Sequence, residues 1–160
     1  MNVIIDHGRY RSVLGHLPTG VVVVAAVDAG EPVGMAVGSF TSVSLDPPLV
    51  GFFAERGSST LPRLRAAGAF SVSVLSSDQE DICRRFAAKG ANKFAGIRWQ
   101  PGNSGSPILA GALAYVECRL DAVREVGDHL LVVGEVIELD VLSSAAPLVF
   151  HRGRYSRLGG

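Results

Sequence analysis

The feature that most constrains the fold is a run of β-rich segments joined by tight turns. The valine-rich segment 19–27 predicts a buried strand, because β-branched side chains pack well on a pleated sheet. Residues 28–32, Asp-Ala-Gly-Glu-Pro, have the composition of a turn, and residues 33–43 predict a second strand. Two strands joined this closely pair as a hairpin and run antiparallel.

The same pattern continues along the rest of the chain. Further strands are expected at 49–54, 70–75, 112–123 and 129–141, followed by a short hairpin over 147–158 that turns at Arg152 and Gly153. Strictly alternating β-α-β units are absent. The sequence therefore favours a mainly β fold, an antiparallel barrel with helices outside it, over a doubly wound parallel sheet. With 160 residues, we expect one domain spanning 1–160.

Three helices are expected between the strands. Over 6–17 the apolar residues recur with helical spacing on one face, at Tyr10, Val13, Leu14 and Leu17. A helix over 60–67 would be capped by Ser59. A helix over 77–88 would begin with a capping box formed by Ser77 and Glu80.

Composition excludes several classes of function. The 15 basic residues balance 15 acidic ones, so no basic excess exists to neutralise the phosphates of a nucleic acid. The longest strongly apolar run, 21–27, is far shorter than the ~20 residues that span a bilayer. Cys83 and Cys118 lack CxxC spacing, which fits buried thiols better than a disulfide or a metal site. We expect a cytoplasmic protein with no metal and no nucleic-acid or membrane partner.

Common motifs for nucleotide sites, for metal sites and for nucleophilic catalysis are missing as well. No GxGxxG follows a strand, and neither a P-loop, a GxSxG elbow nor an HExxH is present. The chain has only four histidines, and they are not clustered. A chain so poor in acid and base clusters needs a cofactor for difficult chemistry.

Hydroxyl side chains gather just before a pair of prolines. They are Ser39, Thr41, Ser42 and Ser44, followed by Pro47 and Pro48. Because proline cannot donate to a strand ladder, nearby backbone groups stay free to bind the polar edge of a flat heteroaromatic ring. An ordinary solvent-facing strand edge explains the same pattern, so both interpretations stay open.

Two further segments are candidates for binding. Residues 56–60, Arg-Gly-Ser-Ser-Thr, precede a predicted helix, where amides, hydroxyls and a guanidinium suit a phosphate, and Lys89 and Lys93 would add charge. His129 follows a turn between two long strands, and an imidazole at a hairpin mouth suits a substrate contact. The alternatives are a capped surface helix with solvated lysines and a turn held locally by Asp128.

Seven segments occur in an order that resembles the flavin reductase-like family, the FMN-binding split barrels. They are LGHLPTGVVVV (14–24), GMAVGSFTSVSLDPPLV (34–50), FSVSVLSSDQ (70–79), RFA with NKF (85–87 and 92–94), GSPILAGALAYVEC (105–118), GDHLLVVGEV (127–136) and PLVFHRGRYSRL (147–158). The resemblance covers nearly the whole chain, from about Tyr10 to Leu158. No single segment suffices, but seven in order are specific.

This resemblance implies a split antiparallel β-barrel with flanking helices, which forms a homodimer with flavin near the interface. The isoalloxazine ring would lie against Met35, Ala36, Val37, Gly38, Ser39, Ser42, Val43 and Ser44. The flavin phosphate would meet Arg56, Ser58, Ser59 and Thr60, with Phe86, Lys93 and Phe94 near the ribityl or phosphate end. The nicotinamide of NADH or NADPH would lie near His129, Arg154 and Tyr155.

The resemblance also implies the activity of an NAD(P)H:flavin oxidoreductase. Hydride would pass from NADH or NADPH to FMN or FAD, with His129 as the catalytic residue that positions the nicotinamide. Reduced flavin would then supply a separate flavin-dependent monooxygenase. The choices between FMN and FAD, and between NADH and NADPH, stay open.

Two alternatives to this activity stay open. One is a non-enzymatic flavin- or haem-binding protein, which is kept open by Ala36 and Gly38, where family members often have Thr and Asn. The other is an FMN-dependent oxidase of a small substrate.

Overall fold

The computed structural model describes residues 3–159 and consists mainly of β-strands. The strands are β1 (Thr19–Gly20), β2 (Val22–Asp28), β3 (Glu31–Val37), β4 (Thr41–Ser44), β5 (Leu49–Glu55), β6 (Ala69–Val74), β7 (Trp99–Pro101), β8 (Pro107–Leu109), β9 (Ala114–Val126), β10 (His129–Val141), β11 (Leu148–His151) and β12 (Arg154–Arg157). The helices are α1 (His7–Leu14), α2 (Leu61–Ala67) and α3 (Glu80–Ala87), and α3 is preceded by the 3₁₀ turn η1 (Ser77–Gln79).

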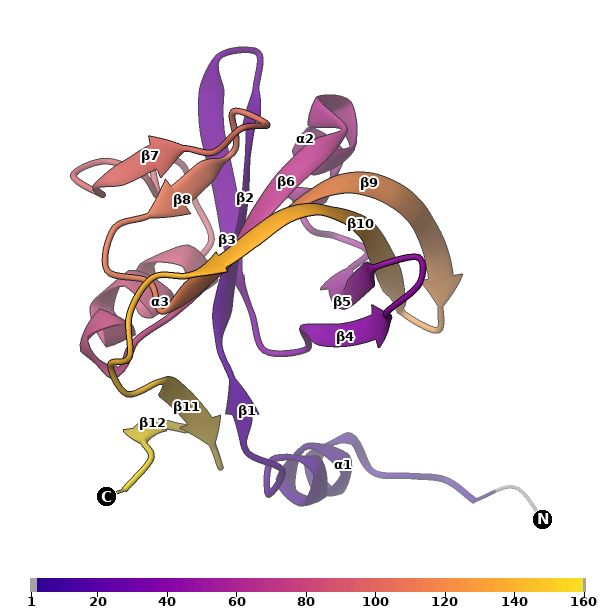
Figure 1. Cartoon of the computed structure of the whole chain (residues 1–160). Coiled ribbons are helices and arrows are strands. Elements are labelled where there is room, and N and C mark those ends of the chain that lie inside the picture. The colour runs from indigo at the N-terminus through magenta and orange to yellow at the C-terminus, as the bar shows by residue number, and fades with distance from the viewer. Residues whose placement is uncertain (1–2, 160) are drawn as a thin grey trace.

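A seven-stranded sheet in the order β3-β2-β6-β9-β10-β5-β4 forms the body of the molecule. Neighbouring strands in it pair antiparallel, and the long β9–β10 hairpin curls over so that the sheet closes around a core (Figure 1). Inside, the fully buried rings of Phe52 and Phe70 pack edge to face, with their centroids 5.8 Å apart. The expected class, a split antiparallel barrel with flanking helices, is confirmed.

A second core lies on the outer face of β2, under α3. Phe86 of the helix is buried there against the β2 residues Val23 and Ala25 and against Leu109 of β8. Two cores on the two faces of β2 explain why almost all of its residues are buried and apolar.

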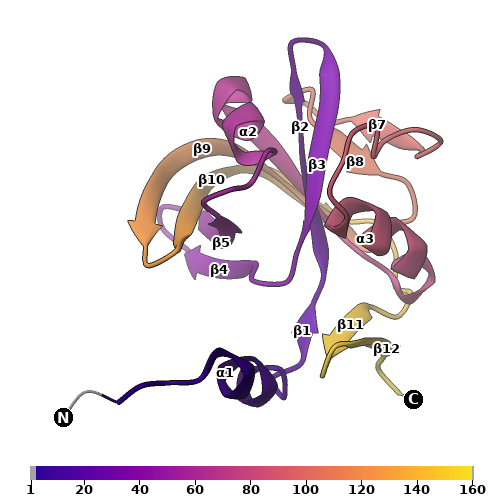
Figure 2. The same cartoon turned by 180° about the vertical axis from the view of Figure 1, so that it is seen from behind.

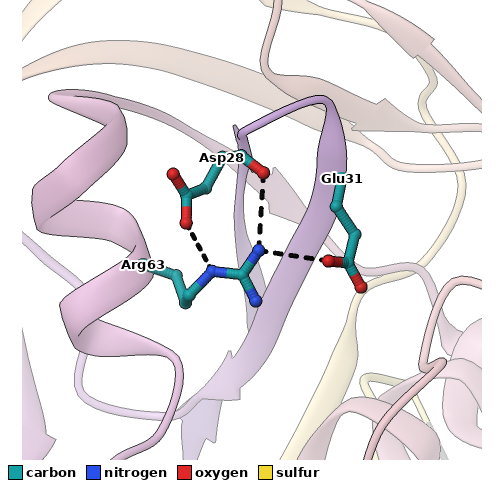
Figure 3. Close-up of polar contacts among 3 residues, drawn as sticks. All are labelled: Asp28, Glu31 and Arg63. Carbon is teal, nitrogen blue, oxygen red and sulfur yellow. Dashed lines mark hydrogen bonds and ion pairs between the residues drawn. The ribbon is translucent and has the colours of Figure 1, made fainter.

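Helix α2 is joined to the β2–β3 hairpin by an arginine. Figure 3 shows Arg63 of α2 with Nε on the Asp28 carboxylate, while its Nη2 donates to the Asp28 carbonyl at 3.4 Å and to the Glu31 carboxylate at 3.2 Å. One guanidinium therefore holds both sides of the hairpin turn. This contact fixes the helix that follows the 56–60 segment.

The two ends of the chain form a separate small sheet. Strand β1 pairs with β11, and β11 with β12, while α1 stands away from the barrel on the far side of β1 (Figure 2). The helix predicted over 6–17 is confirmed for residues 7–14, but it has no buried residue. Its apolar face is at least half exposed, at Tyr10 (58%), Val13 (59%), Leu14 (50%) and Leu17 (65%).

The prediction of one continuous strand over 33–43 is wrong. Strand β3 ends at Val37, and β4 begins at Thr41 and pairs with β5 at the opposite end of the sheet order. The strand predicted over 19–27 also divides, because the chain leaves the small sheet after Gly20 and enters the large one at Val22. Both breaks occur where the chain changes its pairing partner.

Two predicted caps lie one residue from the observed ones. The capping box joins Ser76 and Gln79 instead of Ser77 and Glu80, because Gln79 is buried and also bonds to the Ala110 carbonyl. Ser59 does not cap α2; the hydroxyl of Ser58 accepts from the Leu61 amide at 3.2 Å.

The remaining strands lie close to their predicted places, and the hairpin over 147–158 turns at Arg152 and Gly153 as expected. Strands β7 and β8, of three residues each, were not predicted. Within residues 3–159, no helix is both long and apolar enough to cross a membrane.

Candidate functional site

A groove of about 590 Å³ opens where β3, β5 and β10 meet the ends of the two barrel helices. Its lining consists of residues 35–39 and 53–55, the 57–60 loop before α2, residues 86–89 at the end of α3, and the side chains of Lys93 and His129. This volume lies within the ~300–1,000 Å³ typical of small-molecule sites. Segments distant in the sequence therefore converge on one concave surface.

The floor of the groove is bare at Ala36 and Gly38. Gly38 has no left-handed φ, and a Cβ placed on it would meet only the hydroxyl of Thr19, at 3.4 Å. Neither backbone geometry nor packing within the chain calls for glycine here. What the glycine provides is a flat, open surface, which suits close approach of a planar ring.

The segment beyond the floor is fixed by a side chain. The hydroxyl of Ser39 accepts from the Phe53 amide at 2.9 Å and donates to the Phe53 carbonyl at 3.4 Å. Ser39 thus bonds to both the amide and the carbonyl of Phe53, which lies beyond Gly51, the last β5 residue that pairs with β4. This pairing holds the crossover between β3 and β4 against the groove.

Hydroxyls and amines line the end of the groove near α2 and α3. The hydroxyl of Ser58 is used within the chain, since it accepts from Leu61 and donates to the sulfur of Met35 at 3.7 Å. Lys93 Nζ donates to the Phe86 carbonyl at 3.1 Å, and burial lowers the pKa of this lysine. Lys89 also lines this end, which makes it the most basic part of the groove.

His129 lines the groove from the start of β10. Its Nδ1 lies 2.7 Å from the Asp128 carboxylate, and this hydrogen bond lowers the pKa of Asp128. In the sheet, His129 is paired with Glu55 of β5, which lines the groove beside it. The carboxylate of Asp128 fixes the imidazole ring, so that Nε2 remains available to a ligand.

Several residues proposed from the sequence lie outside the groove lining. Ser42, Val43 and Ser44 lie on the exposed edge strand β4. Arg56 forms an ion pair with Glu125 at 3.4 Å. Phe94 packs edge-on against Phe86, with ring centroids 4.9 Å apart, and lines a neighbouring cavity of about 190 Å³.

Arg154 and Tyr155 lie in a different cavity, of about 430 Å³, on the β11–β12 hairpin. The Cys83 thiol is 3.4 Å from the Tyr155 hydroxyl, and the Arg84 guanidinium lies 4.7 Å from the centre of the Tyr155 ring. Burial and the bond to Cys83 raise the pKa of Tyr155 to about 12. Within one chain, this cavity shares no lining residue with the groove.

The sequence analysis missed Phe53 and Glu55 as groove residues. Strand β5 alternates at this point, with Phe52 and Ala54 inside the barrel and Phe53 and Glu55 outside. That alternation, together with the expected pairing to His129, was the available signal.

Across residues 3–159, no group of three or more His, Cys, Asp or Glu side chains is placed to hold a metal.

Comparison with known proteins agrees with this architecture. The sequence model of the "Flavin reductase like domain" family matches residues 14–159. The chain belongs to the flavin reductase-like family. Within this family, a flavin reductase from Pseudomonas putida is 49% identical over 152 residues, covering 94% of this chain and 89% of its own length.

Other relatives are named as parts of two-protein systems. The HsaB reductase subunit of a flavin-dependent monooxygenase from Rhodococcus jostii is 42% identical, over 95% of this chain and 78% of its own. A nitrilotriacetate monooxygenase component B homologue from Mycobacterium thermoresistibile superposes with a TM-score of 0.93 at 40% identity, covering 96% of this chain and 87% of its own.

A further solved structure was determined with ligand fragments. The NADH:FAD oxidoreductase from Streptomyces globisporus, in complex with NAD and FAD fragments, superposes with a TM-score of 0.91 at 39% identity, over 99% of this chain and 98% of its own. These relatives are named as flavin reductases and as reductase components of monooxygenases.

Proposed function

We propose that this chain is an NAD(P)H:flavin oxidoreductase that reduces FMN or FAD in the groove above Gly38 and supplies reduced flavin to a separate monooxygenase. The observation that carries the proposal is the bare floor at Ala36 and Gly38, because glycine there serves no purpose within the chain. Relatives that are reductase subunits of monooxygenases support the partner. We treat residues 1–160 as one domain, since the family match spans 14–159.

The residues of the groove have separate tasks in this proposal. When bound, the two molecules would supply the chemistry, which is a hydride transfer from the nicotinamide C4 of NADH or NADPH to flavin. The floor at 36–38 and the backbone near Ser39 hold the ring. The Ser59 and Thr60 hydroxyls with Lys89 and Lys93 hold the phosphate, and Ser58 fixes their loop through its bonds to Leu61 and Met35. Phe86 and Phe94 support that end from behind.

His129 is proposed to position the nicotinamide without transferring a proton. Its ring is oriented by Asp128, and it lines the groove beside Glu55. No side chain of the groove needs to act as a general acid or base, because orientation and exclusion of water suffice for hydride transfer between stacked rings. Ser42, Val43, Ser44 and Arg56 remain proposed flavin contacts next to the groove.

A homodimer is also part of the proposal. Helix α1 has eight residues and an exposed apolar face, and an isolated helix of this length is not stable in water. Beyond Val136, no strand within residues 3–159 pairs with β10 on its β5 side, and Leu139 (62%) and Val141 (73%) are exposed there. A second copy would cover both surfaces, and would bring Arg154 and Tyr155 of one chain toward the groove of the other.

A steady-state assay tests the activity. The purified chain is mixed with NADH or NADPH and with FMN, FAD or riboflavin, and loss of reduced nicotinamide is followed by absorbance. We expect oxidation that depends on added flavin. Bound flavin with no such oxidation would favour a carrier or an FMN-dependent oxidase, and a Soret band would favour a haem protein.

We place the protein in the cytoplasm, because both cysteines are free and buried.

A further inference from the structure

Charge is unevenly distributed over this chain. Although the sequence as a whole is neutral, residues 6–20 and 147–158 contain five arginines and a single acidic side chain, Asp6. These segments form α1, β1 and the β11–β12 hairpin, which lie together at one end of the molecule (Figure 1). The Asp6 carboxylate is used by the amides of Gly8 and Arg9 at the start of α1. Within residues 3–159, none of the five arginines forms an ion pair.

A cavity of about 380 Å³ lies inside this basic unit, between the end of α1 and the hairpin turn. Arg11, Ser12 and His16 line it from the helix side, and Arg152 lines it from the turn. No acidic residue lines it. Two arginines about 140 positions apart in the sequence, which the fold brings together, therefore face one cavity.

The carbonyl groups at this helix end are already occupied. The Ser12 carbonyl is bonded by His16 Nδ1 at 2.8 Å, and the Gly15 carbonyl accepts from the Arg152 amide at 2.9 Å. The Arg11 carbonyl accepts from the Gly15 amide at 2.9 Å. The side-chain groups left to bind a ligand are the two guanidinium ions, the Ser12 hydroxyl and His16 Nε2. The two guanidinium ions are positively charged and only donate, which suits an anion.

The conformation of Arg152 adds an independent observation. Its φ is 52° and that of Gly153 is 74°, so both central residues of the two-residue turn are left-handed. Asn, Asp and Gly are favoured at the first position of such a turn, because other side chains clash with the backbone there. An exposed arginine in this conformation is not explained by the turn. A role of the Arg152 side chain would explain why an arginine is found in this left-handed conformation.

The two faces of α1 are also divided by chemistry. Arg11, Ser12 and His16 turn toward the cavity, whereas Tyr10, Val13, Leu14 and Leu17 form the exposed apolar face described above. At helical spacing the two sets lie on opposite sides. A second copy packed on the apolar face would therefore leave the cavity open.

We propose that this cavity binds a phosphoryl group, free or carried by a nucleotide, through Arg11 and Arg152. Guanidinium groups bind tetrahedral phosphoryl oxygens in bidentate fashion, and two of them match a dianion. The volume leaves room for more than one phosphate, so diphosphate is the better probe. The site shares no lining residue with the groove, whereas Arg152 also lines the cavity of Arg154 and Tyr155.

Calorimetric titration of the whole chain with sodium diphosphate, at low ionic strength, tests the site. The variants are Arg11→Ala and Arg152→Gly, the latter chosen because glycine accepts the left-handed φ and preserves the turn. The matched control is Arg65→Ala, since Arg65 lies in the last turn of α2 as Arg11 lies in that of α1. We expect saturable binding that each variant weakens about tenfold or more and the control leaves unchanged.

Two further arms identify the source of the phosphoryl group. FMN is titrated beside riboflavin, and NAD⁺ beside diphosphate, each against wild type and Arg152→Gly. A loss of affinity confined to phosphorylated ligands supports the proposal and names the ligand. Absence of saturable diphosphate binding, or affinity undiminished in either arginine variant, overturns it. Oxidation of NADH with riboflavin reports on the proposed function separately.

Discussion

The side chain of Ser39 substitutes for a strand in its pairing with Phe53. Its hydroxyl contacts both the amide and the carbonyl of that residue, where β4 no longer reaches β5. The chain can therefore leave the sheet at Gly38 without abandoning the backbone groups of β5. This single contact connects the break in the barrel with the position of the groove floor.

Ser39→Ala tests this connection. It removes two hydrogen bonds from a partly exposed pair, so we expect a loss of about 1 kcal/mol in the free energy of unfolding, measured with urea. Because the floor loses its anchor, flavin affinity should fall several-fold. Ser39→Thr retains the hydroxyl and should restore both quantities. A Ser39→Ala variant with native flavin affinity would show that the contact does not position the floor.

His129→Ala is predicted to raise the KM for NADH or NADPH and to leave flavin binding nearly unchanged. The reason is that His129 lines the groove beside Glu55 with its ring held by Asp128, whereas the floor at 36–38 lies at the end of another strand, β3. Asp128→Asn should raise the same KM by less, since the imidazole remains but loses its charged partner. Unaltered nicotinamide kinetics in His129→Ala would remove the role proposed for this residue.

The fully buried Glu117 predicts a pH-dependent stability. Burial raises the pKa of this carboxyl, but hydrogen bonds from the amides of Asn103 and Ser104 (3.2 and 2.9 Å) and the Ser104 hydroxyl (2.7 Å) outweigh it and lower the pKa overall. A lowered folded-state pKa means that the stabilisation is fully present above the unfolded value of ~4.3 and is lost as pH falls through the folded value.

Urea unfolding of wild type and Glu117→Gln, measured from neutral pH to below about pH 4, checks the prediction. Near neutral pH the variant should be less stable by about 1–3 kcal/mol. Its amide nitrogen cannot accept the hydrogen bonds that the carboxylate accepts, so one of the donors is left without a partner. The difference between the two proteins should narrow below about pH 4. A difference that does not vary with pH would show that the charge of Glu117 is unimportant.

The exposed face of α1 predicts the assembly state. Leu14→Asp combined with Leu17→Asp should convert a homodimer to a monomer in light scattering after size exclusion, because charges replace apolar contacts. Arg9→Gln, a change of charge on the same helix unit, should leave the dimer intact. A wild-type protein that is already monomeric would end the dimer proposal.

Much of the fold could be predicted from local sequence, and the errors of this prediction have two causes. Strand β10 and the hairpin at Arg152 and Gly153 were predicted well, since alternation and turn composition are local signals. The break at Gly38 was missed because the residues on both sides of it suit a strand, and only the distant Phe53 decides where pairing ends. Strands β7 and β8 were missed because each has three residues and a proline.

The candidate site shows the same division. Of the groove lining, residues 35–39 and 58–60 together with Phe86, Lys93 and His129 were singled out from the sequence, whereas Phe53 and Glu55 were missed. Sequence reasoning could not place Arg154 and Tyr155, because their position depends on the pairing of β11 with β1 and on contacts with Cys83 and Arg84. Their role at the nicotinamide remains a proposal that requires a second chain.

The most direct test of the central proposal fills the groove floor. Gly38→Val places side-chain atoms where the ring would lie, and Gly20→Val adds the same atoms on β1, where nothing lies within 4 Å. Flavin affinity from fluorescence quenching and kcat/KM for flavin are measured in both variants. We predict that Gly38→Val lowers each at least about tenfold while Gly20→Val matches wild type. A folded Gly38→Val variant with native flavin affinity and native kcat/KM would contradict the account.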